Sequence, residues 1–194
     1  FTYKMEEKKS KPKPNMFLIK TKENADFNQY WYSKVTIEFM KDQVEKYSKS
    51  CGFLSTPSIY FSLKDKDVKS NSKVFDFDRK FAKDPNFIFY DFNKPEDLAE
   101  ELKGTFDYLV IDPPFVTDEV WSLYAQAAKF LLAEDGKILL STIDEKEDFL
   151  KEHLGVSRKT FRPSIPNLVY QYSLYANYED EAFDEANPEI PAFD

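Results

Sequence analysis

A stiff acidic motif, Asp112-Pro113-Pro114-Phe115, is the part of this chain whose residue types and spacing point most directly to chemistry. It follows the apolar run Tyr108-Leu109-Val110-Ile111, which is typical of a buried strand. Each proline fixes φ near about −65° and lacks an N–H, so the backbone beyond Asp112 is rigid and its carbonyls are free to accept. An NH group could donate to the Asp112 carboxylate and the Pro113 carbonyl while packing on the Phe115 ring. The motif therefore predicts a site that holds an amine, although such a sequence in isolation is also a generic turn.

Strands and helices alternate around this motif. We predict strands at residues 52–55, 74–78, 87–90, 106–111 and 137–141, with two closing strands at 158–162 and 170–178. Helices are predicted from Ser33 to Tyr47, for one turn after Pro57, and at residues 93–102, 117–131 and 145–154. Repeated units of strand and helix indicate an α/β fold with a mostly parallel, doubly wound sheet, and the closing strand pair indicates an antiparallel edge.

Polar and aromatic residues also follow the other predicted strands. Asp76 and Asp78 end the second strand, and Asp91 with Phe92 ends the third. In open α/β sheets ligands bind at the carboxyl ends of the strands, where Asp112 also lies. These residues are therefore expected to share one site.

The chain is long enough for one domain with a sizeable core, which we place at residues 27–178. Residues 1–26 are lysine-rich and contain prolines, and we predict a flexible basic arm with little structure. Residues 179–194 carry seven acidic side chains and no Lys or Arg, which predicts an acidic tail that does not contribute to the fold. Removing those seven negative charges from the total of −8 leaves a net charge of −1, without the basic stripe usual in nucleic-acid enzymes.

The composition excludes several kinds of site. Only four glycines occur, so a G-x-G-x-x-G nucleotide loop is absent. Cys51 is the single cysteine, which excludes a disulfide framework and a cysteine-based zinc site, and we expect no metal. Because no apolar run approaches a membrane span and the first residues lack the pattern of a secretory signal, the expected location is the cytoplasm.

The Asp112 motif resembles the (Asp/Asn)-Pro-Pro-(Tyr/Phe/Trp) motif of amino-methyltransferases that use S-adenosylmethionine. Further blocks at residues 29–33, 57–60, 75–81, 87–93 and 106–112 resemble one family in the same order. That family was once labelled putative N6-adenine-specific DNA methyltransferase, and its members are now understood as lysine methyltransferases of eukaryotic translation elongation factor 1-alpha. The resemblance covers about residues 27–178 and implies a Rossmann-like class I methyltransferase.

The resemblance also implies roles for particular residues. Asp112, Pro113, Pro114 and Phe115 would hold the reacting amine, with Asp112 also near the cofactor. Asp78, or Asp76 on the same face of its strand, would accept hydrogen bonds from the ribose hydroxyls, since an ionised carboxylate can accept both. Asp91 and Phe92 would contact the adenine. The amino-acid end of the cofactor would lie near the remaining predicted contacts, which are Ser55, Pro57, Ser58, Trp31, Tyr32 and Ser33.

Two other functions stay open at this point. An adenine N6-methyltransferase acting on RNA or DNA would stack a flipped base on Phe115. A binding module that kept the fold without the activity would explain the missing glycine loop. The resemblance implies a lysine of elongation factor 1-alpha as the substrate, and the missing basic stripe favours a protein substrate over nucleic acid.

Overall fold

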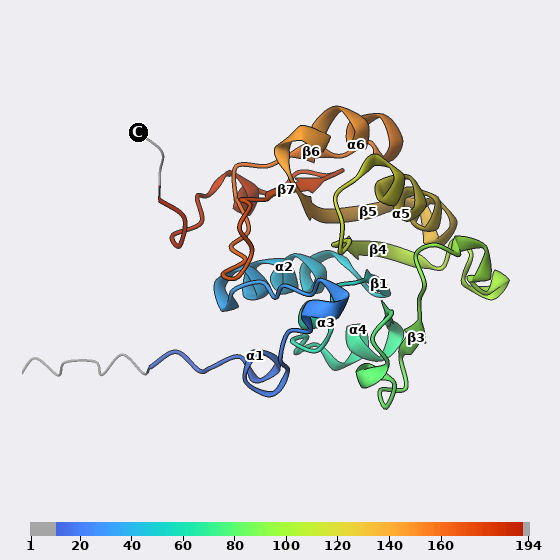
Figure 1. The fold of residues 1–194 in the computed structure, drawn as a ribbon, viewed down its shortest axis with the longest axis horizontal. Helices are drawn as coiled ribbons and strands as arrows, with labels where there is room; N and C mark the ends of the chain where they lie inside the picture. Colours follow the sequence, from blue (N-terminus) through green and yellow to red (C-terminus); the bar gives the residue numbers. More distant parts are fainter. Residues whose placement is uncertain (1–10, 192–194) are drawn as a thin grey trace, which may run out of the picture.

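The computed structural model describes residues 11–191, and these form a seven-stranded sheet with helices on both faces (Figure 1). The strands lie in the order β3-β2-β1-β4-β5-β7-β6. Their bounds are β1 (Cys51–Leu54), β2 (Lys73–Asp76), β3 (Phe87–Phe89), β4 (Phe106–Ile111), β5 (Leu132–Thr142), β6 (Ser157–Arg158) and β7 (Ser173–Ala176). Strands β1 to β5 are parallel, whereas β7 runs antiparallel to both β5 and β6. The predicted fold class, including the antiparallel edge, is confirmed.

Two hydrophobic clusters cover opposite faces of the sheet, because successive strand side chains alternate between the faces. Helices α2 (Lys34–Tyr47), α3 (Pro57–Tyr60) and α4 (Lys66–Asn71) contribute to the cluster that contains Phe53 and Val110. Helices α5 (Asp118–Leu131) and α6 (Glu147–Leu154) contribute to the cluster that contains Leu54 and Ile111. This arrangement leaves the carboxyl ends of β1, β2 and β4 at one edge.

The long helices begin and end at the residues expected from their capping chemistry. Ser33 caps α2 by accepting from the Thr36 N–H, and Thr117 caps α5 by accepting from the Val120 N–H. Helix α6 stops at Gly155, whose φ of 66° is the left-handed conformation that glycine adopts without strain.

The segment before α2 is folded, so the prediction of little structure over residues 1–26 is wrong for its later part. Helix α1 (Met16–Lys20) and the 3₁₀ turn η1 (Ala25–Phe27) lie within it. Phe17 of α1 is buried, with its ring 5.1 Å from Trp31 and 5.9 Å from Phe61. Those partners are distant in sequence, which is why no local pattern revealed the helix. Residues 1–10 lie outside the described part of the chain.

The acidic segment is also part of the fold, contrary to the predicted boundary at residue 178. Phe183, in the 3₁₀ turn η6 (Glu181–Asp184), is fully buried, and its carbonyl accepts from the Phe161 N–H at 2.9 Å. Lys46 donates to Asp180 at 2.7 Å, and Tyr47 donates to the same carboxylate. A run rich in carboxylates therefore packs on the domain because one phenylalanine and one capping aspartate find specific partners there.

Several connections differ from the predicted elements. Residues 93–102 form the two 3₁₀ turns η3 (Pro95–Asp97) and η4 (Glu100–Leu102) instead of one helix. The closing strands pair only over β6 and β7, so residues 159–172 form a long loop between them. Two further 3₁₀ turns, η2 (Arg79–Phe81) and η5 (Asp144–Lys146), follow β2 and β5.

None of the helices between residues 11 and 191 has both the length and the apolar character needed to cross a membrane.

Candidate active site

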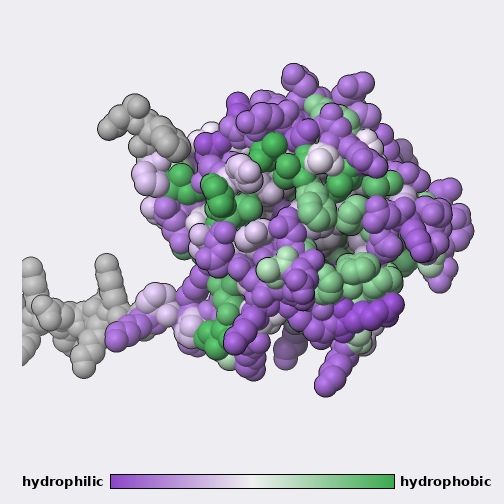
Figure 2. Space-filling model, in the orientation of Figure 1, coloured by the Kyte–Doolittle hydropathy of each residue, from purple (hydrophilic) through white to green (hydrophobic). Residues whose placement is uncertain are grey.

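A cavity of about 300 Å³ lies at the carboxyl edge of the sheet. The register aligns Leu54 of β1 with Phe75 of β2 and with Ile111 of β4, so the residues that follow these three lie side by side. The face seen in Figure 2 carries hydrophobic side chains across its middle and hydrophilic ones around its periphery. Every predicted site residue except Ser33 lines the cavity, namely Trp31, Tyr32, Ser55, Pro57, Ser58, Asp76, Asp78, Asp91, Phe92, Asp112, Pro113, Pro114 and Phe115.

Asp112 is the acidic group at the end of β4, and its carboxyl lies against two buried hydroxyls. Ser141 of β5 donates to it at 3.5 Å, and the Tyr32 hydroxyl is 2.5 Å from the Ser141 hydroxyl. Removal from water raises the pKa of Asp112 to about 8, although the Tyr32 and Ser141 hydroxyls favour the charged form. No cation faces this carboxyl among the described residues that set its pKa, so it is a partly buried acid without a counter-ion.

The rest of the motif presents a fixed backbone and an exposed ring. Asn28 donates its side-chain amide to the Pro114 carbonyl, which joins the segment before α2 to the motif. Asn28 itself has a φ of 52°, a conformation that asparagine tolerates better than most residues. The Phe115 ring is 49% exposed and meets the Phe92 ring edge-on at 6.4 Å.

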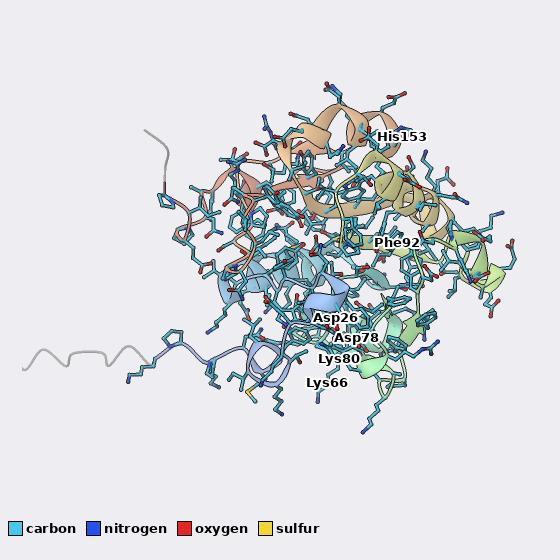
Figure 3. The ribbon with its side chains drawn as sticks, viewed as in Figure 1. Asp26, Lys66, Asp78, Lys80, Phe92 and His153 are labelled. Carbon is cyan, nitrogen blue, oxygen red and sulfur yellow. The ribbon has the colours of Figure 1, made fainter. Side chains whose placement is uncertain are left out.

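Asp76 and Asp78 both reach the cavity, but their surroundings differ. Burial raises the pKa of Asp76 to about 7, helped by the neighbouring Asp78 charge and opposed by a bond of 2.9 Å from the Asp78 N–H. The pKa of Asp78 is lowered, because donors outweigh its burial: the Lys80 N–H, the Gln29 amide at 2.9 Å and the Lys80 ammonium at 3.2 Å. Figure 3 shows Asp78 and Lys80 in the same region as Asp26. Asp78 therefore has its partners within the protein, whereas Asp76 retains most of its capacity to accept from a ligand.

The turn after β1 replaces a glycine loop with hydroxyl residues. Ser55 has a φ of 59°, where glycine is the usual residue, and its hydroxyl is 2.7 Å from that of Tyr124. Pro57 starts the four-residue helix α3, and Ser58 behind it is buried. The strained Ser55 brings the backbone close to the cavity in the way a glycine would.

Aromatic residues close the two ends of the cavity. Phe92 lies 5.7 Å from the Tyr124 ring, and Asp91 beside it accepts from Asn93. At the other end Trp31 donates to the Thr21 carbonyl at 3.0 Å and is largely buried, so most of its ring is used for packing.

Ser33 is the one predicted cofactor contact that the structure does not bring to the cavity. Its hydroxyl caps α2 and donates to Glu189 at 2.5 Å, which commits both of its hydrogen-bonding roles to the fold.

Two segments contribute site residues that the sequence did not reveal. Asp26, Phe27, Asn28 and Gln29 come from around η1, and Ile165, Leu168 and Tyr172 come from the loop between β6 and β7. Apart from Gln29, which begins one of the family blocks, neither segment has a motif of its own, and the only available signal was its density of aromatic and amide side chains. Within residues 11–191 the cavity is lined by five carboxylates and by no Lys, Arg or His.

The described residues contain no group of three or more His, Cys, Asp or Glu side chains arranged to hold a metal. The single histidine, His153, lies on α6, well away from Asp26, Asp78 and Phe92 (Figure 3).

The fold resembles solved structures of low sequence identity. One is a branched-chain polyamine synthase from Thermus thermophilus, solved with N4-aminopropylspermidine and 5′-methylthioadenosine. It has a TM-score of 0.60 at 12% identity, and the match covers 82% of this chain and 59% of the synthase chain. A 1,6-didemethyltoxoflavin-N1-methyltransferase from Burkholderia thailandensis has a TM-score of 0.50 at 9% identity, covering 74% of this chain and 76% of its own. These similarities establish the fold alone.

Sequence relatives are more specific. The chain is 33% identical over 164 residues to human EEF1A lysine methyltransferase 1, covering 81% of this chain and 76% of the relative. It is 30% identical over 194 residues to the protein-lysine N-methyltransferase EFM5 of Saccharomyces cerevisiae, covering 88% and 77%. The model of one methyltransferase family also matches residues 23–180. The chain therefore belongs to the family described as probable N6-adenine methyltransferase, which is the family expected from its sequence blocks.

Proposed function

We propose that this protein transfers a methyl group from S-adenosylmethionine to a lysine side chain of translation elongation factor 1-alpha. The observation that carries the proposal is the chemistry of the cavity wall, which has five carboxyl groups and no cationic side chain among the described residues. A lysine ammonium and a sulfonium are both cations, so each is attracted there. The names of the human and yeast relatives both supply a protein lysine as the methyl acceptor, and the human name also supplies the elongation factor.

The residues present fit the proposed cofactor. Asp76 is a buried carboxyl whose own hydrogen bonds leave room for two ribose hydroxyls. Asp91 and Phe92 are suited to an adenine, the first as an acceptor and the second as a stacking ring. Ser55 and Ser58 lie at the turn where the amino-acid end would bind. When bound, S-adenosylmethionine supplies a methyl group on a positively charged sulfur, and S-adenosylhomocysteine is the neutral product.

Asp112 has two tasks in this proposal. Its carboxylate orients the incoming ammonium together with the Pro113 carbonyl. It is also suited to accept the ammonium proton, because the lysine nitrogen needs a free lone pair to attack. An ordinary aspartate differs from lysine by more than ~6 pKa units, whereas a pKa of about 8 reduces the gap to ~2 units below the reference lysine value of ~10.4.

The alternative substrate is an adenine amino group in RNA or DNA, which the half-exposed Phe115 ring could stack. An adenine amine is neutral and its strand carries phosphates. The cavity wall offers those phosphates no cation within the described residues. The charge distribution therefore favours lysine.

Incubation with labelled S-adenosylmethionine tests the proposal. The purified protein is offered purified elongation factor 1-alpha, total RNA or duplex DNA in parallel. We expect label only on the elongation factor, with mass spectrometry locating the methyl group on a lysine nitrogen. Label on the nucleic acid alone would show that the adenine alternative is correct.

A further inference from the structure

The loop between β6 and β7 carries an exposed apolar pair beside the cavity. We define residues 163–172 as the mouth loop. Its Ile165, Leu168 and Tyr172 line the cavity, whereas Val169 is 93% exposed and Tyr170 is 68% exposed. Neither exposed residue belongs to a hydrophobic cluster or an aromatic pair among residues 11–191. Both side chains are thus free to contact another molecule.

The mouth loop is held in place by hydrogen bonds from several segments. The Ser33 N–H donates to the Ser164 carbonyl at 2.8 Å, and the Ser164 N–H donates to the Thr36 hydroxyl at 2.9 Å. Gln171 spans the loop by donating to the Pro163 and Tyr172 carbonyls at 2.9 and 2.8 Å. In Figure 1 the loop runs beside the first turns of α2. The exposed pair therefore lies at the tip of a braced loop, and ordering it on binding costs little.

The position of the mouth loop relates it to the reacting group. Tyr172 and Asp112 both line the cavity, and the pKa of Tyr172 is raised first by burial and then by the nearby Asp112 carboxylate. Phe77, the half-exposed aromatic beside Asp76 and Asp78, instead has partners, with Phe27 at 5.5 Å and Phe89 at 5.4 Å. The unpartnered apolar surface is thus on the Asp112 side of the cavity, where the methyl-accepting group must enter.

We propose that Val169 and Tyr170 form a docking surface for the folded protein substrate. They would contact the basic surface of the substrate around its target lysine. This inference rests on the proposed function. Residues 163–172 contain no charged side chain, so the loop does not repel a basic surface, while the carboxylates of the adjoining cavity attract it. A nucleic acid would find no cation for its phosphates at these two side chains.

The test is the double variant Val169→Ser with Tyr170→Ser, assayed on purified elongation factor 1-alpha. We expect the KM for the elongation factor to rise about tenfold, equivalent to ~1.4 kcal/mol, with kcat unchanged. The dissociation constant of S-adenosylmethionine, measured by calorimetry, and the Tm should equal those of the wild type. Tyr170→Phe should retain the wild-type KM because it keeps the apolar area.

Ile19→Ser is the matched control, since Ile19 is 60% exposed on α1 and does not line the cavity. It should leave the KM unchanged. A wild-type KM in the double variant would overturn the docking surface while leaving the proposed function intact. A fall in Tm or in cofactor affinity in that variant would also overturn it, because the loop would then act through the fold. Failure of the wild-type protein to methylate the elongation factor would instead overturn the proposed function and the docking surface with it.

Discussion

At the scale of single residues, the charge of Asp112 distinguishes the two possible substrates. Asp112→Asn keeps the shape and the acceptor oxygen but removes the charge and the site that accepts the proton. We expect at least about a tenfold fall in kcat/KM on the elongation factor, from losing one charge-assisted contact of roughly 1.5–3 kcal/mol. Affinity for S-adenosylhomocysteine, which lacks the sulfonium charge, should stay within about twofold. Initial rates and calorimetric titration measure both. Undiminished activity on the protein would refute the charge argument for lysine.

The raised pKa of Asp112 also predicts how ligand binding depends on pH. Its carboxyl gains charge as the pH rises through about 8, so the sulfonium of S-adenosylmethionine should bind better at high pH. S-adenosylhomocysteine is the control, because it differs only by the missing methyl group and the sulfonium charge that this group creates. Over an assay range of about pH 6.5 to 9, we expect the affinity for S-adenosylmethionine to rise relative to the affinity for S-adenosylhomocysteine. A ratio independent of pH, or an equal trend in Asp112→Asn, would contradict this role.

The folding stability contributed by such carboxyls depends on pH in the opposite direction to ligand binding. The folded pKa values of Asp112 and Asp76, about 8 and about 7, lie above the ordinary value for aspartate. Stability from these groups is therefore fully present below pH ~4 and is lost as the pH rises through the folded values. Keeping these two carboxyls at the cavity, where ligands can reach them, therefore lowers the stability of the ligand-free protein at high pH.

Asp76 and Asp78 can be separated by paired variants. The sequence favours Asp78 as the ribose acceptor, but the structure shows its oxygens already bound to Gln29 and Lys80. We expect Asp76→Ala to weaken S-adenosylhomocysteine binding at least tenfold, because two contacts of roughly 1.5–3 kcal/mol are lost. Asp78→Ala should mainly lower the Tm, by releasing the cap of η2. Calorimetry and thermal melting of both variants decide the matter, and a greater affinity loss in Asp78→Ala would restore the ribose role to Asp78.

At the scale of elements, α1 stabilises one wall of the cavity from outside. Phe17 packs on Trp31, whose neighbours Asn28 and Gln29 reach Pro114 and Asp78. Phe17→Ala should destabilise the fold by about 3–5 kcal/mol or release this wall locally, since a buried ring is lost. We expect weaker S-adenosylhomocysteine binding and faster hydrogen exchange over residues 16–31. Ile19→Ala on the same helix is the exposed control, and equal exchange in both variants would show that the wall holds without α1.

How far the elements could be predicted depended on whether their signals were local. Ser33, Thr117 and Gly155 cap helices through contacts within a few residues, so the sequence shows where those helices begin or end. The site residues at strand ends were equally visible, because parallel strands place their carboxyl ends together. Tyr172 and Asn28 were not, since they reach the cavity from long connections whose path depends on contacts with distant residues. Phe17 and Phe183 were missed for the same reason, because each finds its partners in distant parts of the chain.

At the scale of the whole molecule, the acidic segment at residues 179–191 packs against the earlier part of the domain. Phe183 is fully buried and Asn187 donates to the Arg162 carbonyl at 2.8 Å. Phe183→Ala should therefore cost about 3–5 kcal/mol in the free energy of unfolding, measured by denaturant titration. Phe89→Ala, at a ring that is 39% exposed, should cost clearly less. Equal stability of Phe183→Ala and the wild type would support the acidic segment as a dispensable tail.

The hydrogen bond between Ser33 and Glu189 sets an order of events during synthesis, because its residues are 156 positions apart. At about 5–20 residues per second, the ribosome makes the partner of Ser33 roughly 8–30 s after Ser33 itself. Strands β1 to β4 can pair before that, since their contacts span shorter stretches of chain. The contact between the first turn of α2 and the segment near residue 189 therefore forms last, after the mouth loop has been made. A growing chain would thus possess its cofactor-facing strands well before it could hold a protein substrate.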